Sequence, residues 1–190
     1  QNILTQESQI ITEFKTNHLT NPKKIAYGEN YRPYDARWFA KISANMDLAG
    51  VTSLKYSSSN RAIAVDNLFV RTLPTMDPLF YSSKIAGEGY PFDNLQETAL
   101  FIGMPLYIIK QSLDKEWSLV IASDDIGWVK TAGLARVNAR FIKNWQKAAK
   151  AGLTVVPAGS VIIDVNGKVI GEGNAKTEKV GVNQEVYQQN

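Results

Sequence analysis

The residues that could perform acid-base or nucleophilic chemistry are few. The sequence has no cysteine and a single histidine, His18. A thiol nucleophile is therefore excluded, and any imidazole-based triad would depend on His18 alone. A zinc site would have to be built almost entirely from carboxylates, which is unusual. We therefore expect no metal site, no cofactor and no catalytic residue, and a solvated or capping role for His18.

Other chemical patterns are equally weak. Asp124 and Asp125 are adjacent, so they point to opposite sides of an extended chain and indicate a turn more than an acid-base pair. The glycines of "GEGY" (87–90) lack the strand-to-helix context of a phosphate-binding loop. The 21 basic and 18 acidic residues are interspersed, which disfavours a nucleic-acid partner. No window approaches the ~18 apolar residues of a membrane span.

Aromatic side chains remain as candidates for binding. Tyr81, Tyr90 and Phe92 lie in a stretch, residues 75–96, that is rich in glycine, proline and serine. The stretch is too long for an ordinary connection, and long loops inside compact domains are commonly functional. Trp117 and Trp128 stand at the two ends of a predicted β-hairpin. Each tryptophan belongs either to the core or to a groove between the loop and the hairpin.

Two helices are predicted before these strands. In "SQIITEFKTNHLT" (8–20) apolar residues recur at helical spacing, and Pro22 sets the end of the helix. A second helix is predicted over residues 35–47. The apolar positions of the two helices are Ile10, Ile11, Phe14 and Leu19, and Trp38, Phe39, Ile42 and Met46. A linker-like segment, "KYSSSN" (55–60), then predicts a domain boundary at residue 60.

Short strands separated by turn residues follow from Arg61 onward and predict a small β-barrel or sandwich. Asp66 and Asn67 indicate a hairpin between strands 61–65 and 68–74. Further strands are predicted over residues 98–102, 105–112, 116–122 and 127–130. Residues 138–152 show a helical pattern with Gly152 as its C-cap. The Asn-Gly pair in "DVNGKV" (164–169) indicates a second hairpin.

Residues 61–137 resemble the bacterial SH3 domain that precedes the catalytic domain in NlpC-type cell-wall cysteine peptidases. The matching pieces stand in the family's order: "FVRTLPT", "PFDNLQETAL", "GMPLYII", "SLDKEW" and "GWV". Residues 1–60, with the helix "ARWFAKI", resemble the helical stabilising segment of such proteins. Residues 138–190 resemble a connecting helix and a partial second SH3-like unit. The resemblance implies a mainly β chain with a helical N-terminal segment (α+β), built around a small SH3-like β-barrel.

The resemblance also implies a function. Family members cleave the γ-D-glutamyl to diamino acid bond of peptidoglycan stem peptides with a papain-like domain. Their SH3 domain packs against that domain, and its long loop helps to wall the substrate cleft, favouring peptides with a free N-terminal L-alanine. This chain has no cysteine and too few residues for a papain-like domain of about a hundred residues. We therefore expect a non-catalytic module of the bacterial cell envelope, periplasmic or secreted, that works with a papain-like domain in cis or in trans.

Five residues are predicted to bind the stem peptide: Tyr90, Phe92, Asp93, Gln96 and Trp117. Asp93 would pair with the amine of the peptide. In the alternative, Phe92 and Leu95 anchor the loop, while Asp93 and Gln96 satisfy backbone groups of the loop. Trp128 is expected at the end of the barrel, and Trp117 closer to the groove. A protein-interaction module that docks a peptide or a separate peptidase is the competing function, and an enzyme in its own right is a third.

Overall fold

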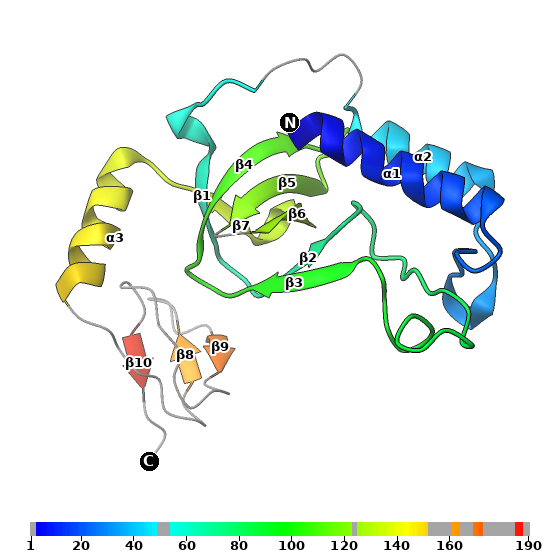
Figure 1. The fold of residues 1–190 in the computed structure, drawn as a ribbon. Helices are drawn as coiled ribbons and strands as arrows, with labels where there is room; N and C mark the ends of the chain where they lie inside the picture. Colours follow the sequence, from blue (N-terminus) through cyan, green and yellow to red (C-terminus); the bar gives the residue numbers. More distant parts are fainter. Residues whose placement is uncertain are drawn as a thin grey trace.

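The structure is a computed structural model that describes residues 3–48, 54–122, 125–151, 161–163, 169–172 and 185–187. It is mainly β with a helical N-terminal segment, as predicted (Figure 1). The helices are α1 (Ile3–Thr20), α2 (Ala36–Met46) and α3 (Ala139–Ala151), with 3-10 turns at Glu29–Tyr31, Ser58–Asn60 and Thr131–Gly133. The strands are β1 (Arg61–Ala64), β2 (Leu68–Arg71), β3 (Gln96–Leu100), β4 (Pro105–Gln111), β5 (Trp117–Ala122), β6 (Asp125–Lys130), β7 (Leu134–Arg136), β8 (Val161–Ile163), β9 (Val169–Glu172) and β10 (Glu185–Tyr187).

Helix α1 ends before Pro22, as predicted, but it begins five residues earlier than the apolar pattern indicated. Its buried residues are Leu4, Glu7 and Ile11, which share one face of the helix. Leu19, predicted for that face, is exposed. The prediction placed the start of α1 too late, because the buried residue Glu7 is charged and interrupts the apolar pattern of this face.

Helix α2 agrees closely with its prediction. It begins after Asp35, whose carboxylate accepts a hydrogen bond from the backbone N–H of Trp38 (3.0 Å), and such N-caps stabilise a helix start. Phe39, Ile42 and Met46 form its buried face. The helix stops at Asp47, whose backbone is left-handed (φ 49°).

The seven strands β1–β7 form one antiparallel sheet in the order β3-β2-β6-β5-β4-β1-β7. The predicted hairpin between the first two strands is wrong, because β1 pairs with β4 and β7 while β2 pairs with β3 and β6. The N–H of Val65 also donates to the Gly133 carbonyl (2.9 Å), which extends the contact between β1 and β7 by one residue. The expected barrel is also corrected: β3 and β7 are the two ends of the sheet and no pairing within the described residues closes it.

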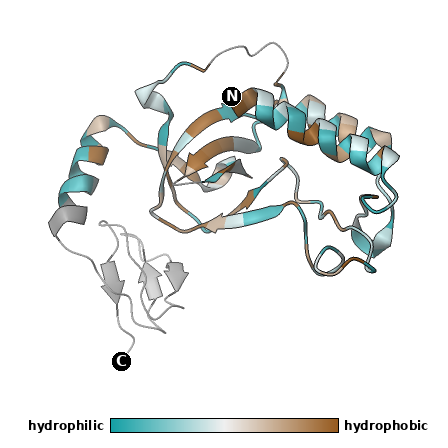
Figure 2. Ribbon diagram, viewed as in Figure 1, coloured by the Kyte–Doolittle hydropathy of each residue, from teal (hydrophilic) through white to brown (hydrophobic). Residues whose placement is uncertain are grey.

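Two clusters of buried side chains hold this part of the molecule together. One lies within the sheet and includes Ala62, Val70, Leu106, Val120 and Val129. The other joins α1 and α2 to the sheet and to the loop between β2 and β3; it includes Leu4, Phe39, Leu79, Leu95, Trp117 and Trp128. Figure 2 shows the hydrophobic residues along β4, β5 and the two helices. The helical segment and the sheet therefore share a core, and the domain boundary at residue 60 stays a prediction.

The third region follows its prediction where it is described. Helix α3 covers all but the ends of the predicted segment, and the side chain of Asn138 accepts a hydrogen bond from the N–H of Phe141 (2.9 Å) at its start. Strands β8 and β9 pair antiparallel, as a hairpin requires, and β10 pairs with β8 on the other side. The Asn-Gly turn, Gly152 and Asp124 lie outside the described residues.

A glycine at the contact between β2 and β6 yields a stability prediction. A Cβ atom on Gly127 would lie 2.5 Å from Cγ1 of Val70 and 3.1 Å from the carbonyl oxygen of Arg71. Because the second neighbour is backbone, the strands would have to separate. Gly127→Ala should lower the free energy of unfolding by about 1–3 kcal/mol, measured by chemical denaturation. An unchanged denaturation midpoint would contradict this packing.

Candidate binding site on the loop of residues 72–95

The loop between β2 and β3, residues 72–95, is the long loop that the sequence predicted. It is pinned to the core by the fully buried side chains of Leu73, Leu79 and Leu95. Leu95 thus anchors the loop, as one of the two interpretations required. Phe92 does not, because 57% of its surface is exposed.

A buried arginine organises the base of the loop. Arg71, at the end of β2, places Nη2 2.8 Å from Oδ2 of Asp93 and donates from it to the carbonyl of Asp77 (3.0 Å). The other carboxylate oxygen of Asp93 accepts hydrogen bonds from the N–H groups of Leu79 (2.9 Å) and Leu95 (3.0 Å). Both oxygens of Asp93 are therefore engaged within the loop, where they fix its path.

Gln96 lies beside this pair. Its amide nitrogen donates to the Thr98 carbonyl (2.6 Å), and its amide oxygen is 3.5 Å from Nη1 of Arg71. Asp93 thus satisfies backbone groups of the loop, as the structural interpretation required, whereas the partners of Gln96 lie on β2 and β3 and not in the loop. Nε of Arg71 is buried and has no hydrogen-bond partner among the described residues. Arg71 stood in the "FVRTLPT" motif, but nothing in its local sequence indicated that it would be buried.

The N-terminal segment holds the loop from the other side. The backbones of Tyr27 and Phe80 exchange two hydrogen bonds of 2.8 Å each. Lys24 forms an ion pair with Glu88 (2.7 Å). Two side chains complete the contact: Tyr34 donates to the Pro78 carbonyl (2.6 Å), and Nε1 of Trp38 donates to Asp77 (2.8 Å). Contacts along both the connector and α2 therefore set the shape of the loop.

Three aromatic rings, Tyr31, Phe80 and Tyr90, form what we term the aromatic ledge. The ring centroids of Tyr31 and Phe80 are 6.3 Å apart, and those of Phe80 and Tyr90 are 5.7 Å apart. The N–H of Tyr90 donates to the hydroxyl of Tyr31 (2.8 Å). Phe80 is buried beneath, whereas Tyr31 and Tyr90 are 39% and 72% exposed. Phe92 lies two residues further along, also exposed, so the ledge and Phe92 offer apolar surface to a ligand.

Tyr31 was not predicted as a site residue. It and Asn30 both have left-handed backbones, with φ of 52° and 57°. This conformation is uncommon for a bulky residue and clusters at functional sites. The Tyr31 ring lies against the loop, where its hydroxyl accepts the hydrogen bond from Tyr90. The only signal in the sequence was the turn composition of "GENYRP" (28–33).

The two tryptophans are core residues. Trp128 is fully buried, and its Nε1 donates to Oε2 of Glu7 on α1 (3.0 Å). Trp117 is only 4% exposed, and Nζ of Lys130 lies 4.5 Å from its ring centroid. Trp117 therefore does not line a groove on this chain, contrary to the expectation. Helices α1 and α2 cover the sheet face on which both tryptophans lie.

The one histidine has a structural role. Nδ1 of His18 accepts a hydrogen bond from the N–H of Ala26 (3.0 Å), and its ring packs against Phe39 with centroids 5.2 Å apart. Across the described residues, no group of three or more histidine, aspartate or glutamate side chains is placed to hold a metal ion. In the same part of the chain, no helix is long and apolar enough to cross a membrane.

Two comparisons with known proteins bear on the fold of this chain. Residues 78–130, which include most of the loop and strands β3–β6, match the family SH3 domain (SH3b1 type). Over its whole length the chain is similar to a solved structure described as a novel NlpC/P60 endopeptidase from Photobacterium damselae subsp. piscicida, with 30% identity and a TM-score of 0.72. The chain spans 43% of that protein. A search of curated proteins finds no match.

Proposed function

Since the chain carries an SH3b region of the kind found in an NlpC-type peptidase, we propose that it is the non-catalytic module of a bacterial cell-wall endopeptidase. In this role the loop of residues 72–95 binds a peptidoglycan stem peptide and presents it to a papain-like catalytic domain, in cis or in trans. The module works in the cell envelope, where the stem peptides are.

The aromatic ledge carries this proposal. Tyr90 and Phe92 expose large apolar surfaces, although contacts on both sides fix the loop that bears them. Ordering a loop costs free energy on binding, so a loop that is already ordered binds more tightly for the same contacts. Aromatic rings also supply large contact areas with few rotatable bonds. A small peptide is a suitable ligand for such a surface.

The predicted residues then divide into two roles. Tyr90 and Phe92, with Tyr31, contact the ligand. Asp93 and Gln96 act through Arg71 and keep the loop in the conformation that exposes the rings. Oδ2 of Asp93 can accept one more hydrogen bond, so an amine of the ligand remains its proposed second partner.

The proposal predicts a localised response to a stem peptide. Titration with L-Ala-γ-D-Glu-diamino acid, followed by backbone NMR, should give saturable shifts at Tyr90 and Phe92. Tyr90→Ala should weaken the binding by roughly tenfold, since removal of a central aromatic contact typically costs more than 1 kcal/mol. Phe101→Ala is the matched control, because Phe101 is also an exposed aromatic residue (58%, against 72% for Tyr90) but follows the end of β3 that is remote from the loop. It should leave the affinity unchanged.

A second function, docking of a separate peptidase domain, is favoured by the same exposed rings, because aromatic residues are enriched in protein interfaces. The titration separates the two. Without any response at millimolar peptide, the ledge would have to be one wall of a cleft completed by another domain, and binding by the isolated module would be ruled out. Equal affinities for Tyr90→Ala and the control would reject the ledge as the site.

A further inference from the structure

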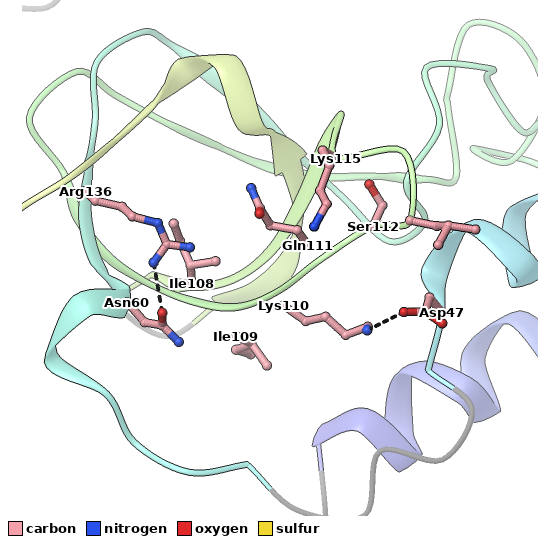
Figure 3. A pocket seen from close by; sticks show the side chains of 10 residues that line it. Asp47, Asn60, Ile108, Ile109, Lys110, Gln111, Ser112, Lys115 and Arg136 are labelled. Atoms are coloured by element: carbon pink, nitrogen blue, oxygen red, sulfur yellow. Dashed lines mark hydrogen bonds and ion pairs between the residues drawn. The ribbon is translucent and has the colours of Figure 1, made fainter.

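A concave site separate from the aromatic ledge lies at the C-terminal end of α2. Trp38, in the first turn of α2, contacts the loop of residues 72–95, whereas Asp47, just after the helix, borders a cavity of about 330 Å³. The cavity is formed mainly by the end of β4 and the turn that follows it, with Asn60 and Arg136 on the far side (Figure 3). We term it the β4-edge cavity. Its residues are not those of the ledge.

The edge of β4, not a face of it, borders this cavity. Six consecutive residues, 108–113, line it, whereas alternate residues of a strand point to opposite faces. The sheet register gives the reason: β1 pairs with β4 only as far as Arg61 opposite Tyr107. Beyond Tyr107 no described strand lies beside β4 on this side, while β5 continues to pair on the other side as far as Gln111. The last four residues of β4, 108–111, thus have no described strand beside them on this side, where the 3-10 turn Ser58–Asn60 contacts β4, and we call this the open edge.

Cationic side chains surround the open edge. Lys110 forms an ion pair with Asp47 (2.8 Å), and Nη1 of Arg136 donates to Asn60 Oδ1 (2.9 Å) and to the Ser59 carbonyl. The remaining nitrogens of Arg136 and the Nζ of Lys115 make no hydrogen bond or ion pair with described residues. Figure 3 shows the Lys115 and Arg136 side chains on either side of Gln111. Three cations and one carboxylate leave the cavity positively charged.

We propose that the β4-edge cavity binds a short extended peptide that carries carboxylates. The peptide backbone adds a strand to β4 at residues 108–111, the recognition mode in which main-chain hydrogen bonds give affinity and neighbouring side chains give specificity. A carboxylate of the peptide pairs with Lys115 and Arg136, because charge-assisted hydrogen bonds to carboxylates are strong. Four residues of strand span about 13 Å, and the cavity volume is near the lower end for ligand sites, so the bound segment is three or four residues long.

Charges beside an open edge have another known use, which is to prevent pairing of one sheet with another. The two roles make different predictions. Protection against aggregation requires only that the charges be present, whereas a peptide site requires saturable binding that depends on both the backbone and the charge of the ligand.

The test uses a probe peptide, acetyl-Val-Glu-Val-Ala with a free carboxyl terminus, titrated into the whole chain and followed by backbone NMR. Saturable shifts are expected for the amides of residues 108–113. The uncharged peptide acetyl-Val-Gln-Val-Ala-amide should bind at least tenfold more weakly, and so should a version of the acidic peptide with methylated amide nitrogens. Weaker binding of the uncharged peptide would show that the carboxylates contribute to the affinity. Weaker binding of the methylated peptide would show that main-chain hydrogen bonds to β4 contribute to it.

A variant of Lys115 separates the site from general electrostatics. Lys115 has a left-handed backbone (φ 65°), which asparagine tolerates, so Lys115→Asn removes the charge without breaking the turn. This variant should bind the acidic peptide about five- to tenfold more weakly than the unchanged chain does. Lys23→Asn, at an exposed lysine away from the cavity, should have no effect and serves as the control. The proposal is overturned if the acidic peptide gives no saturable shifts at millimolar concentration, or if all three peptides bind equally.

Discussion

Replacing Asp93 with alanine is expected to lower the free energy of unfolding by about 3–5 kcal/mol. Arg71 is almost completely buried, and Asp93 supplies the charge that faces it at 2.8 Å. Removal of one partner of a buried ion pair leaves the other charge without compensation. The substitution also leaves the N–H groups of Leu79 and Leu95 without their acceptor.

Chemical denaturation measures this loss, with Asp66→Ala as the control. Asp66 is exposed, and among the described residues its side chain accepts a hydrogen bond only from the neighbouring N–H of Asn67 (2.8 Å), so its replacement should cost well under 1 kcal/mol by the rule for surface sites. The double variant Asp93→Ala with Arg71→Met should be more stable than Asp93→Ala alone, because the uncompensated charge is gone. If Asp93→Ala cost as little as the control, the pair would not organise the loop.

This result would decide how binding variants are chosen. Asp93 was predicted as a ligand contact, yet loss of binding on its replacement would follow from the collapse of the loop alone. Tyr90 and Phe92 carry no such ambiguity, because their exposed rings can be removed without disturbing the base of the loop.

The second large effect concerns the dependence of stability on pH. Burial raises the pKa of Glu7 to about 7, and the carboxylate of Glu97 acts in the same direction; the hydrogen bond from Trp128 opposes them. A carboxyl with a raised pKa holds its proton more tightly in the folded chain than in the unfolded chain. Its contribution to stability is therefore complete below the ordinary pKa of about 4.5 and is lost as the pH rises through 7. The expected loss is up to about 3 kcal/mol.

Denaturation of the chain and of Glu7→Gln at a series of pH values between 4 and 8 tests this expectation. Glutamine keeps an oxygen that can accept the hydrogen bond from Trp128 but has no proton to lose, so the decline between pH 4.5 and 7 should be smaller in this variant. Glu13→Gln provides the control, because Glu13 is an exposed residue of the same helix. The same decline in Glu7→Gln as in the unchanged chain would show that other groups cause it.

Local patterns predicted most of the elements, because each depends on residues close in sequence. The spacing of Trp38, Phe39, Ile42 and Met46 predicted α2, and Pro22 predicted the end of α1. The prediction of a hairpin at Asp66 was wrong for the same reason. A local turn signal shows that the chain bends, but it does not show which strands pair with each other. The pairing of β1 with β4 and β7 involves residues about 44 and 72 positions away, by the spacing of their registers.

The candidate site was predictable in part. The length and composition of the loop identified it. Tyr90 and Phe92 are exposed on it, and their role in binding stays a prediction. Tyr31 was missed because its position depends on a left-handed backbone in the connector. Trp117 was misplaced because a tryptophan in a strand gives no sign of whether helices from the start of the chain cover it.

The bond between Glu7 and Trp128 joins residues 121 positions apart. During synthesis the chain emerges from its N-terminus, so α1 leaves the ribosome well before the strand that it covers. Until β5 and β6 are made, Leu4 and Ile11 lack the part of their core that Trp117, Leu119 and Trp128 supply. Contacts of such long range slow folding and prolong the exposure of apolar surface. The nascent chain therefore passes through a period in which its first helix is a target for chaperones and for self-association.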